Sequence, residues 1–452
     1  MNLERTPEFD EALHKIRDGK AFVFITGRAG TGKSTLLRYF VDQCKKRSPV
    51  LAPTGVAALN VGGETIHRFF KIPPSVDLAT ARMEAESRKK PEIYRKIETI
   101  IIDEISMVRA DLFDAMDLFL QIIRQDKRPF GGVRIIGIGD LYQLPPVVTT
   151  YDKGQFDQKY QTPYFFSSLA YKNLHAMDEV DFAELSKIYR QNDEHFIELL
   201  NAIRNRDVTP IQLAKINSRI ISGEPPEDSI LLTPTNEAAD FINQRKLGEI
   251  QSEFFIFDGV VNGKFKEKDA PTDVRLLLKV GARVMCVAND LKGQYVNGSL
   301  GWVVDIVRGD GGSPAVTVQL DDVVEPVKIE TYTWNIHRSK YNKRTQELTQ
   351  EEVGSFKQIP LRLAWAVTIH KSQGKTFNKV TLDLGRGAFA AGQIYVALSR
   401  CRDFEGLSLI KPVTLSQLKA NDDVANFFDH VLGQPAEVEY LEDQEVGQLY
   451  MT

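Results

Sequence analysis

The sequence predicts an α/β protein built from two parallel-sheet domains, with a small antiparallel β module inserted in the second. Three patterns support this fold class. Short apolar strands alternate with helices over the first part of the chain, as in parallel sheets. The same strand–turn–helix order returns near residue 230. Between residues 297 and 334, β-branched residues alternate with Gly and Asp turns, which is typical of an antiparallel module.

Length and composition agree with several soluble globular domains. At 452 residues the chain is too long for one hydrophobic core. Its hydrophobic content of 42%, charged content of 26% and net charge of −4 are ordinary values. No apolar run approaches the roughly 18 residues of a membrane helix, and residues 1–20 resemble neither a secretion signal nor a transit peptide. We therefore expect no membrane contact. Cys44, Cys286 and Cys401 lack the spacing of a metal site or a disulfide framework, so we expect the protein in a reducing cytoplasm.

The first domain is justified by its order of strands and helices. Apolar strands begin residues 21–44, 48–63, 98–108 and 133–147, and residues 111–124 have helical periodicity. In such sheets ligands bind at the carboxyl ends of the strands. The charged segment at about 71–95 interrupts this order, and we expect it to form a surface protrusion, with Pro73 and Pro74 as a candidate wedge.

A second cycle begins at residue 229 and weakly repeats the first. Leu51-Ala52-Pro53-Thr54 matches Leu232-Thr233-Pro234-Thr235, which indicates either a duplication or a shared turn preference. We therefore predict the following division: a first domain at 1–185, a second domain in two parts at 186–254 and 358–431, an insert at 255–357 and an acidic tail at 432–452.

A complete phosphate-binding loop follows the first strand. Residues 27–34 read GRAGTGKS between a strand and a helix, where backbone N–H groups can surround phosphate oxygens. Lys33 is expected to reach the β and γ phosphates, and Ser34 to bind Mg²⁺. The candidate nucleotide-binding residues of this loop are Gly27, Ala29, Gly30, Thr31, Gly32, Lys33, Ser34 and Thr35.

Acidic and basic candidates for ATP hydrolysis follow later in the chain. Asp103 and Glu104 end an apolar strand, where Asp103 suits the metal and Glu104 suits the attacking water. Two such acids can also form a plain solvated turn, but their place beside a phosphate loop favours catalysis. Arg190 and Arg400 are candidate cations for the γ-phosphate, although each taken alone reads as a surface charge.

Seven blocks in this order resemble a superfamily-one helicase, closest to the Pif-type branch that is related to RecD-like enzymes. They are GRAGTGKS, APTGVAALNVGGETIH, IIIDEISMV, GDLYQLPPV, LSKIYRQ, LAWAVTIHKSQGKTF and YVALSR, spanning residues 22–400, and the helix ending in RPFGGVRII is the mark of the branch. The resemblance implies a 5′-to-3′ DNA helicase that uses ATP and Mg²⁺, with two RecA-like domains around the nucleotide and an SH3-like insert. It also implies roles in DNA replication, DNA repair and telomere maintenance.

The resemblance assigns further residues of the ATP site. Gln143 would sense the γ-phosphate, Arg190 and Arg400 would act as arginine fingers, and Gln373 with Gly374 would line the far side of the nucleotide. One position departs from the family pattern. The usual adenine-reading glutamine is replaced by Phe9, so adenine is read differently or stacked upon.

A second loop that suits phosphate contact lies at residues 368–376. It would be explained if two domains grip single-stranded DNA in alternation. Gripping phosphates without reading bases needs hydroxyls, backbone N–H groups and a few cations. The candidates in the first domain are Thr54, Gly55, Thr65 and His67; those in the second are Thr235, Asn236, Thr368, His370, Lys371 and Ser372. Helix-capping threonines and buried histidines are the plain alternatives. Phe69 and Phe70 suit base stacking or the core.

The expected partners are single-stranded and forked duplex DNA, with G-quadruplexes and RNA–DNA hybrids as further candidates. We expect a monomer in the bacterial cytoplasm at the nucleoid, or in the nucleus or mitochondrion if the chain is the core of a eukaryotic protein. Two other classes remain open from the residues. One is a small-molecule kinase, and the other is a DNA loader that grips DNA without separating strands.

Overall fold

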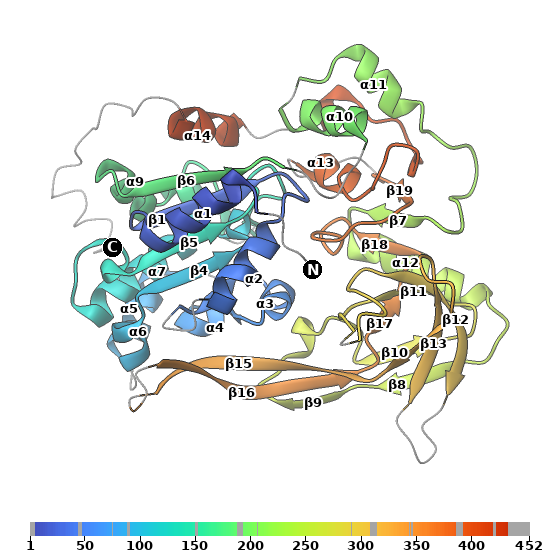
Figure 1. Ribbon diagram of the computed structural model, residues 1–452, viewed down its shortest axis with the longest axis horizontal. Coiled ribbons are helices and arrows are strands. Elements are labelled where there is room, and N and C mark those ends of the chain that lie inside the picture. The colour runs from blue at the N-terminus through green and yellow to red at the C-terminus, as the bar shows by residue number, and fades with distance from the viewer. Residues whose placement is uncertain are drawn as a thin grey trace. The chain divides into compact units, whose positions relative to one another are not determined.

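The computed structural model describes residues 5–43, 48–74, 76–87, 91–149, 152–187, 193–205, 207–290, 292–307, 314–342, 344, 347–385, 392–418 and 422–432. The chain divides into two compact units (Figure 1). Unit 1 comprises residues 1–189, 337–352 and 421–452, and unit 2 comprises residues 190–336 and 353–420. Arg190 and the acidic tail from residue 433 lie outside the described residues, so the predictions made for them stay predictions.

Unit 1 is built on a six-stranded parallel sheet, as the sequence predicts. The strand order is β3-β2-β4-β5-β1-β6, and every pairing is parallel. The strands are β1 (Phe22–Gly27), β2 (Val50–Ala52), β3 (Glu64–Thr65), β4 (Thr99–Asp103), β5 (Arg134–Ile138) and β6 (Val180–Leu185). All six residues of β1 are buried because the sheet is covered on both faces.

Helices cover both faces of this sheet. On one face, α1 (Pro7–Asp18) and α2 (Lys33–Gln43) pack against Val23 and Ile25. On the other, Phe22 and Phe24 pack against a larger cluster of helices. That cluster includes α4 (Ile66–Phe70), α5 (Leu78–Glu86), α6 (Glu92–Lys96), α7 (Ala110–Arg124), α9 (Leu169–Ala176) and α14 (Asp422–Leu432). The short helices α3 (Gly55–Asn60) and α8 (Lys153–Lys159) complete the unit.

The C-terminal helix α14 belongs to unit 1, although the sequence led us to expect it in the second domain. Phe427 stacks on Phe166 at a centroid distance of 4.5 Å, and Phe428 lies 6.5 Å from Phe24 of β1. Burying a phenylalanine contributes roughly 1.5–3 kcal/mol. These two rings therefore hold α14 on the sheet of unit 1.

The segment at 71–95 folds as two helices docked on unit 1. Ala81 and Ala85 of α5 are buried against α7, and the Tyr94 hydroxyl of α6 donates to the Phe69 carbonyl at 2.7 Å. Pro73 and Pro74 are exposed at its start, so the wedge remains a prediction. Phe69 and Phe70 are 4% and 0% exposed, which places both rings in the core and excludes them as stacking surfaces in this structure.

Unit 2 contains a smaller parallel sheet with strand order β18-β7-β19-β20. Its strands are β7 (Ile230–Thr233), β18 (Ala366–Thr368), β19 (Val380–Leu382) and β20 (Leu407–Leu409), and its helices are α10 (Glu194–Asn205), α11 (Pro210–Asn217), α12 (Asn236–Glu249) and α13 (Gln393–Leu398). Helix α12 packs Ala239 against Leu231 and Ala366. The predicted second α/β domain is thus present as a second parallel sheet.

An antiparallel module interrupts unit 2 between β7 and β18. Its five-stranded sheet has the order β14-β13-β12-β11-β17, and two smaller sheets have the orders β10-β8 and β15-β16-β9. The strands are β8 (Phe255–Asp258), β9 (Val260–Gly263), β10 (Arg275–Leu278), β11 (Arg283–Cys286), β12 (Leu300–Val307), β13 (Ala315–Leu320), β14 (Val327–Glu330), β15 (Tyr332–Asn342), β16 (Glu347–Gln358) and β17 (Leu361–Leu363). The antiparallel character agrees with the sequence, whereas the SH3-like assignment stays a prediction.

Residues 337–352, the distal part of the β15–β16 hairpin, are grouped with unit 1. The amide of Ser339 donates to the Glu64 carboxylate at 3.3 Å, and Gln350 Nε2 donates to the Gly62 carbonyl at 3.1 Å. Burial raises the pKa of Glu64 to about 7, while the Ser339 amide and two arginines oppose the rise. The hairpin therefore contacts β3, which contains Thr65 and precedes His67, and the turn before it.

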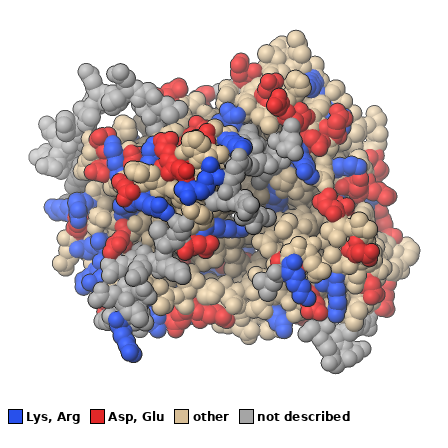
Figure 2. All heavy atoms as spheres, viewed as in Figure 1, with Lys and Arg blue, Asp and Glu red and all other residues tan. Residues whose placement is uncertain are grey.

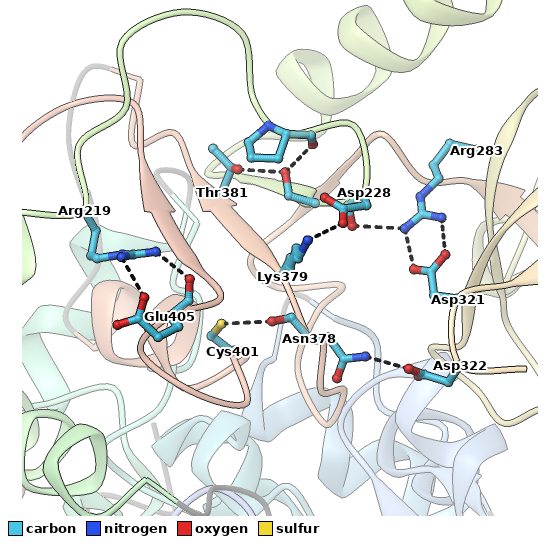
Figure 3. A network of polar contacts seen from close by, with 12 residues as sticks. Arg219, Asp228, Arg283, Asp321, Asp322, Asn378, Lys379, Thr381, Cys401 and Glu405 are labelled. Carbon is cyan, nitrogen blue, oxygen red and sulfur yellow. Dashed lines mark hydrogen bonds and ion pairs between the residues drawn. The ribbon is translucent and has the colours of Figure 1, made fainter.

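A polar network fixes the inserted module to the parallel sheet of unit 2 (Figure 3). Both terminal nitrogens of the buried Arg283 contact the Asp321 carboxylate at 2.6 Å, and one also donates to the Asp228 carbonyl at 3.2 Å. Asn378 donates to Asp322 at 2.7 Å, and Lys379 pairs with Asp228. The module is thus held against the loops that begin β7 and β19.

The surface carries both signs of charge. Basic and acidic side chains are interspersed on the face shown in Figure 2, in keeping with a net charge of −4. Within the described ranges, no helix has the length and hydrophobicity needed to cross a bilayer.

Candidate active site

The phosphate loop joins β1 to α2 at the carboxyl edge of the unit 1 sheet. Gly30 and Gly32 have φ values of +86° and +87°, a left-handed conformation that glycine adopts without a steric penalty. At Gly27, an added Cβ would lie 2.6 Å from the Leu185 carbonyl and from Thr31 Oγ1, so only glycine fits between β6 and the loop. The hydroxyl of Thr31 donates to the Arg28 carbonyl at 2.9 Å and tightens the turn.

Lys33 lies at the start of α2 and turns back over the loop. Its Nζ atom donates to the carbonyl oxygens of Gly27 at 2.6 Å and Arg28 at 2.9 Å. Phosphate oxygens are stronger acceptors than these carbonyls because they carry charge. The loop therefore holds the ammonium group where the phosphate contact is predicted. Ser34 and Thr35 are exposed at the same helix start, and Ala29 is buried in the loop.

The acidic pair sits at the end of β4. Burial raises the pKa of Asp103 to about 7, the Glu104 carboxylate adds to the rise, and the charges of Lys33 and Arg38 oppose it. The fold thus brings Asp103 within electrostatic reach of Lys33. Glu104 has φ +52° and ψ +43°, a left-handed conformation that costs a non-glycine residue roughly 1–2 kcal/mol. Strain of this kind often accompanies a functional constraint.

Oxygen donors at this edge suit a hard divalent cation. The Asp103 carboxylate and the Ser34 hydroxyl are ligand types that Mg²⁺ prefers, and a bound cation would favour the ionised form of Asp103. Within the described residues there is no cluster of three or more His, Cys, Asp or Glu side chains that could hold a metal by themselves. The Asp103 carboxylate and the Ser34 hydroxyl are oxygen donors that could hold Mg²⁺ together with nucleotide phosphates.

Gln143 lies in the loop after β5, and a residue that the sequence analysis did not assign holds it there. Gln143 Nε2 donates to Asp140 Oδ2 at 3.1 Å, while the amide of Tyr142 donates to Asp140 Oδ1 at 3.2 Å. Asp140 is fully buried and Gln143 is 7% exposed. The ring of Tyr142 stacks on Phe428 of α14 at 5.4 Å, with an interplanar angle of 2°. The sequence signal for Asp140 is its place in the stretch GDLYQ, three residues before Gln143.

Phe9, at the position expected to read adenine, belongs to the core. It is 6% exposed, packs in the cluster of α1 and α2, and meets Tyr39 edge-on at 5.8 Å. Its ring in this structure fills the core of unit 1 and presents no free face.

The loop after β18 in unit 2 carries Gln373 and Gly374. Ser372 is buried, and its hydroxyl donates to the Ile369 carbonyl at 2.7 Å. Gly374 has φ +74°, which favours glycine. The buried Arg400 donates from Nη1 to the carbonyls of Ser372 and Lys375, each at 3.4 Å, and from Nη2 to Ser399 at 2.8 Å. Arg400 thus supports the loop in this structure, and its role as a finger stays a prediction.

Three of the threonines predicted to contact DNA cap the N-termini of helices α3, α4 and α12. Thr54, Thr65 and Thr235 accept bonds from the amides of Ala57, Arg68 and Ala238 at 3.2–3.3 Å. Thr54 and Thr235 occupy matching places, each after a strand and before a helix whose first residue is Gly55 or Asn236. The capping alternative is therefore correct for all three, and DNA contact by the same hydroxyls remains a prediction.

The remaining candidates lie beside these caps. His67 Nδ1 is 3.1 Å from the Ile72 carbonyl. In unit 2, Thr368 is buried and its hydroxyl accepts the Lys371 amide at 3.2 Å. Burial lowers the pKa of His370, and burial together with the charge of Arg362 lowers that of Lys371. Thr368, His370, Lys371 and Ser372 therefore form one turn, with Lys371 exposed.

Comparison with known proteins reveals close similarity over most of the chain. A family model for the PIF1-like helicase matches residues 2–212. A curated relative, ATP-dependent DNA helicase Pif1 of Bdellovibrio bacteriovorus, is 34% identical over 90% of this chain and 88% of its own length. The zebrafish ATP-dependent DNA helicase PIF1 is 35% identical over 92% of this chain, which spans only 62% of that longer protein.

Solved structures show the same similarity. Bacteroides sp Pif1 in complex with ADP-AlF4 superposes with a TM-score of 0.86 at 37% identity, covering 94% of this chain and 96% of that chain. Bacteroides Pif1 bound to ssDNA superposes with a TM-score of 0.65 at 36% identity, covering 94% and 97%. A structure describing DNA unwinding at forked dsDNA by two Pif1 helicases gives 0.67 at 37% identity, covering 96% and 98%.

Proposed function

The chain belongs to the PIF1-like helicase family, and on this premise we propose that it is an ATP-driven motor that moves 5′-to-3′ along single-stranded DNA and unwinds duplex DNA. The observation that carries the proposal is the gathering of three groups at one sheet edge. Lys33 follows β1, Asp103 ends β4 and Gln143 follows β5, with β5 lying between the other two strands. The carboxyl ends of neighbouring parallel strands meet at the same edge, where such sheets bind nucleotides.

Each of these groups has a task in ATP hydrolysis. Lys33 would exchange its two carbonyl acceptors for β- and γ-phosphate oxygens. Glu104 would orient the attacking water, and Gln143, held by Asp140, would contact the γ-phosphate. Ser34 and Asp103 would hold Mg²⁺, which neutralises phosphate charge when bound. Arg190 and Arg400 remain the proposed cations for the transition state.

DNA movement requires two grips that alternate. The matched turns at Thr54 and Thr235, one in each unit, support the proposal because each places a hydroxyl and a helix N-terminus at the end of a strand. ATP binding and hydrolysis would change how tightly each unit holds the strand. Forked DNA, G-quadruplexes and RNA–DNA hybrids are proposed substrates, and we propose that the protein acts as a monomer in the bacterial cytoplasm.

A forked duplex with either a 5′ or a 3′ single-stranded tail tests the function. The wild-type protein should separate the 5′-tailed fork in the presence of ATP and Mg²⁺, leave the 3′-tailed fork paired, and hydrolyse ATP faster when single-stranded DNA is added. A rate of ATP turnover that does not change when DNA is added would favour a small-molecule kinase. DNA-stimulated turnover with no strand separation on either fork would favour a loader.

A further inference from the structure

Two basic residues of unit 2, Arg362 and Lys371, lie within electrostatic reach of each other, and neither side chain forms an ion pair among the described residues. Arg362 is on β17, where it pairs with Met285 of β11 in antiparallel register. Cross-strand partners project to the same face of a sheet. Its neighbour Leu361 belongs to the core of the inserted module, so Arg362 projects from the opposite face. Lys375, from the loop after β18, reaches Met285 Sδ on that face at 3.7 Å. Arg362 therefore faces the predicted DNA-contact loop.

The guanidinium of Arg362 has no acceptor in the part of the chain that the structure describes. It makes no hydrogen bond or ion pair there, and its Nε atom is buried. The side chain of Lys371 likewise has no acceptor or ion-pair partner among the described residues. Buried polar groups in folded proteins are almost always bonded, so the buried, unbonded Nε atom of the half-buried Arg362 is available to an anionic ligand.

Electrostatics point the same way. Desolvation is the largest effect on both residues and lowers both pKa values, and the charge of Arg362 lowers the pKa of Lys371 and of Lys375 further. Asp240 and Asp273 partly offset this, but both are exposed and neither forms an ion pair with Arg362 or Lys371 in the described chain. An anion bound by the two cations would offset their mutual repulsion and the cost of burying their charge.

We propose that Arg362 and Lys371 together bind one backbone phosphate of single-stranded DNA. The proposal rests on the proposed function and adds a residue, Arg362, that belongs to the inserted module. An arginine fork binds two phosphate oxygens at once, and Lys371 would add a point charge. The turn at Thr368–Ser372 brings Lys371 to this place, because the Thr368 hydroxyl caps the Lys371 amide. Strand and loop thus form a clamp on the DNA backbone.

The test measures oligothymidylate affinity as a function of salt for wild type, Arg362→Met, Lys371→Met and the double variant. Each phosphate contact to a single strand contributes about 0.7 to the slope of log K against log salt. We expect each single variant to lose about tenfold in affinity at moderate salt, which is typical of one charged hydrogen bond. We expect a slope lower by about 0.7, and less than additive losses in the double variant. Arg362→Lys should recover part of the slope.

A matched control is Arg275→Met, because Arg275 is an exposed arginine of the same module that pairs with Asp258. It should change neither the affinity nor the slope. ATP affinity without DNA should be equal in all variants, whereas a loss there would assign the pair to nucleotide phosphate and overturn the proposal. An unchanged slope in a folded Arg362→Met protein would also overturn it. If wild type binds oligothymidylate but unwinds neither fork, the helicase function fails while the phosphate site stands.

Discussion

The ammonium group of Lys375 donates to Asn297 Oδ1 across 2.8 Å, which ties the loop carrying Gln373 and Gly374 to the turn between β11 and β12 of the inserted module. The same loop is also held by Arg400, which donates to the Lys375 carbonyl. The loop predicted to face ATP is therefore supported by the insert as well as by its own sheet.

Lys375 makes the stability of unit 2 depend on pH. Burial, helped by the charge of Arg362, lowers its pKa from 10.5 to about 7. The unfolded chain thus binds more protons than the folded chain between these two values, and the free energy of unfolding should rise with pH from about 7 to 10. Lys375→Met should abolish this rise and be the more stable protein at pH 7. The free energy of unfolding at each pH is measured by urea titration with tryptophan fluorescence as the signal, since Trp302, Trp334 and Trp365 all lie in unit 2.

A parallel pH series on Lys379→Met provides the control, because Lys379 is half exposed and pairs with Asp228. The control should keep the wild-type rise above pH 7. An identical pH profile for Lys375→Met and wild type would show that Lys375 titrates normally.

Lys33→Ala should abolish ATP hydrolysis. The substitution removes the cation that the loop holds over Gly27 and Arg28, so the β and γ phosphates lose their principal side-chain contact. DNA-stimulated phosphate release and fork unwinding should fall below detection, while oligothymidylate binding without nucleotide stays near the wild-type value. Lys20→Ala, which breaks a surface pair with Asp178, serves as the control. Retained unwinding in the Lys33 variant contradicts the proposed function.

Asp140→Ala should slow hydrolysis without weakening ATP binding. Asp140 accepts from the Gln143 side chain and the Tyr142 amide, so its loss frees Gln143 from its position. We expect kcat to fall about tenfold, equivalent to one hydrogen bond to a charged group, with KM for ATP within about twofold. Asp140→Asn keeps one acceptor oxygen, so its kcat should lie between those of wild type and Asp140→Ala. A change confined to KM would place Asp140 in nucleotide binding instead.

The ion pair of Arg283 and Asp321 should govern how firmly the insert is attached. Arg283 is fully buried, and removing one partner of a buried pair costs about 3 kcal/mol or more. Arg283→Met should lower the free energy of unfolding of unit 2 by about that amount, and adding Asp321→Asn should restore part of it. Tryptophan fluorescence follows the change, since Arg283 lies over Trp302 at 5.0 Å.

The exposed pair of Lys328 and Glu330 gives the comparison. Lys328→Met should alter the free energy of unfolding by less than about 1 kcal/mol. Equal effects of the Arg283 and Lys328 substitutions would refute the anchoring role of the buried pair.

The parts that the sequence predicts well are those coded by neighbouring residues. The phosphate loop at 27–34, the buried strands before Asp103 and Gly139, and the paired turns at Thr54 and Thr235 all depend on short spacings. The family resemblance built on these blocks is confirmed by the similarity to Pif1 proteins.

The parts that escape prediction depend on residues far apart in the chain. The contact of Arg283 with Asp321, the bond of Lys375 to Asn297 and the packing of Phe428 on Tyr142 have no local signal. Phe69 and Phe70 follow a pattern that fits both a core and a stacking surface, and only packing against Tyr94 and Phe119 decides between them. The docking of α14 on unit 1 likewise requires the whole fold.

That docking has a consequence for biosynthesis. The core of unit 1 needs Phe427 and Phe428, which leave the ribosome after all of unit 2 has been made. Strand β7 cannot pair with β18 until the insert has been translated, on the order of ten seconds later at ordinary rates of synthesis. Nascent chains should therefore expose apolar surface from both units at once, and a polypeptide stalled before residue 422 should be a preferred client of chaperones.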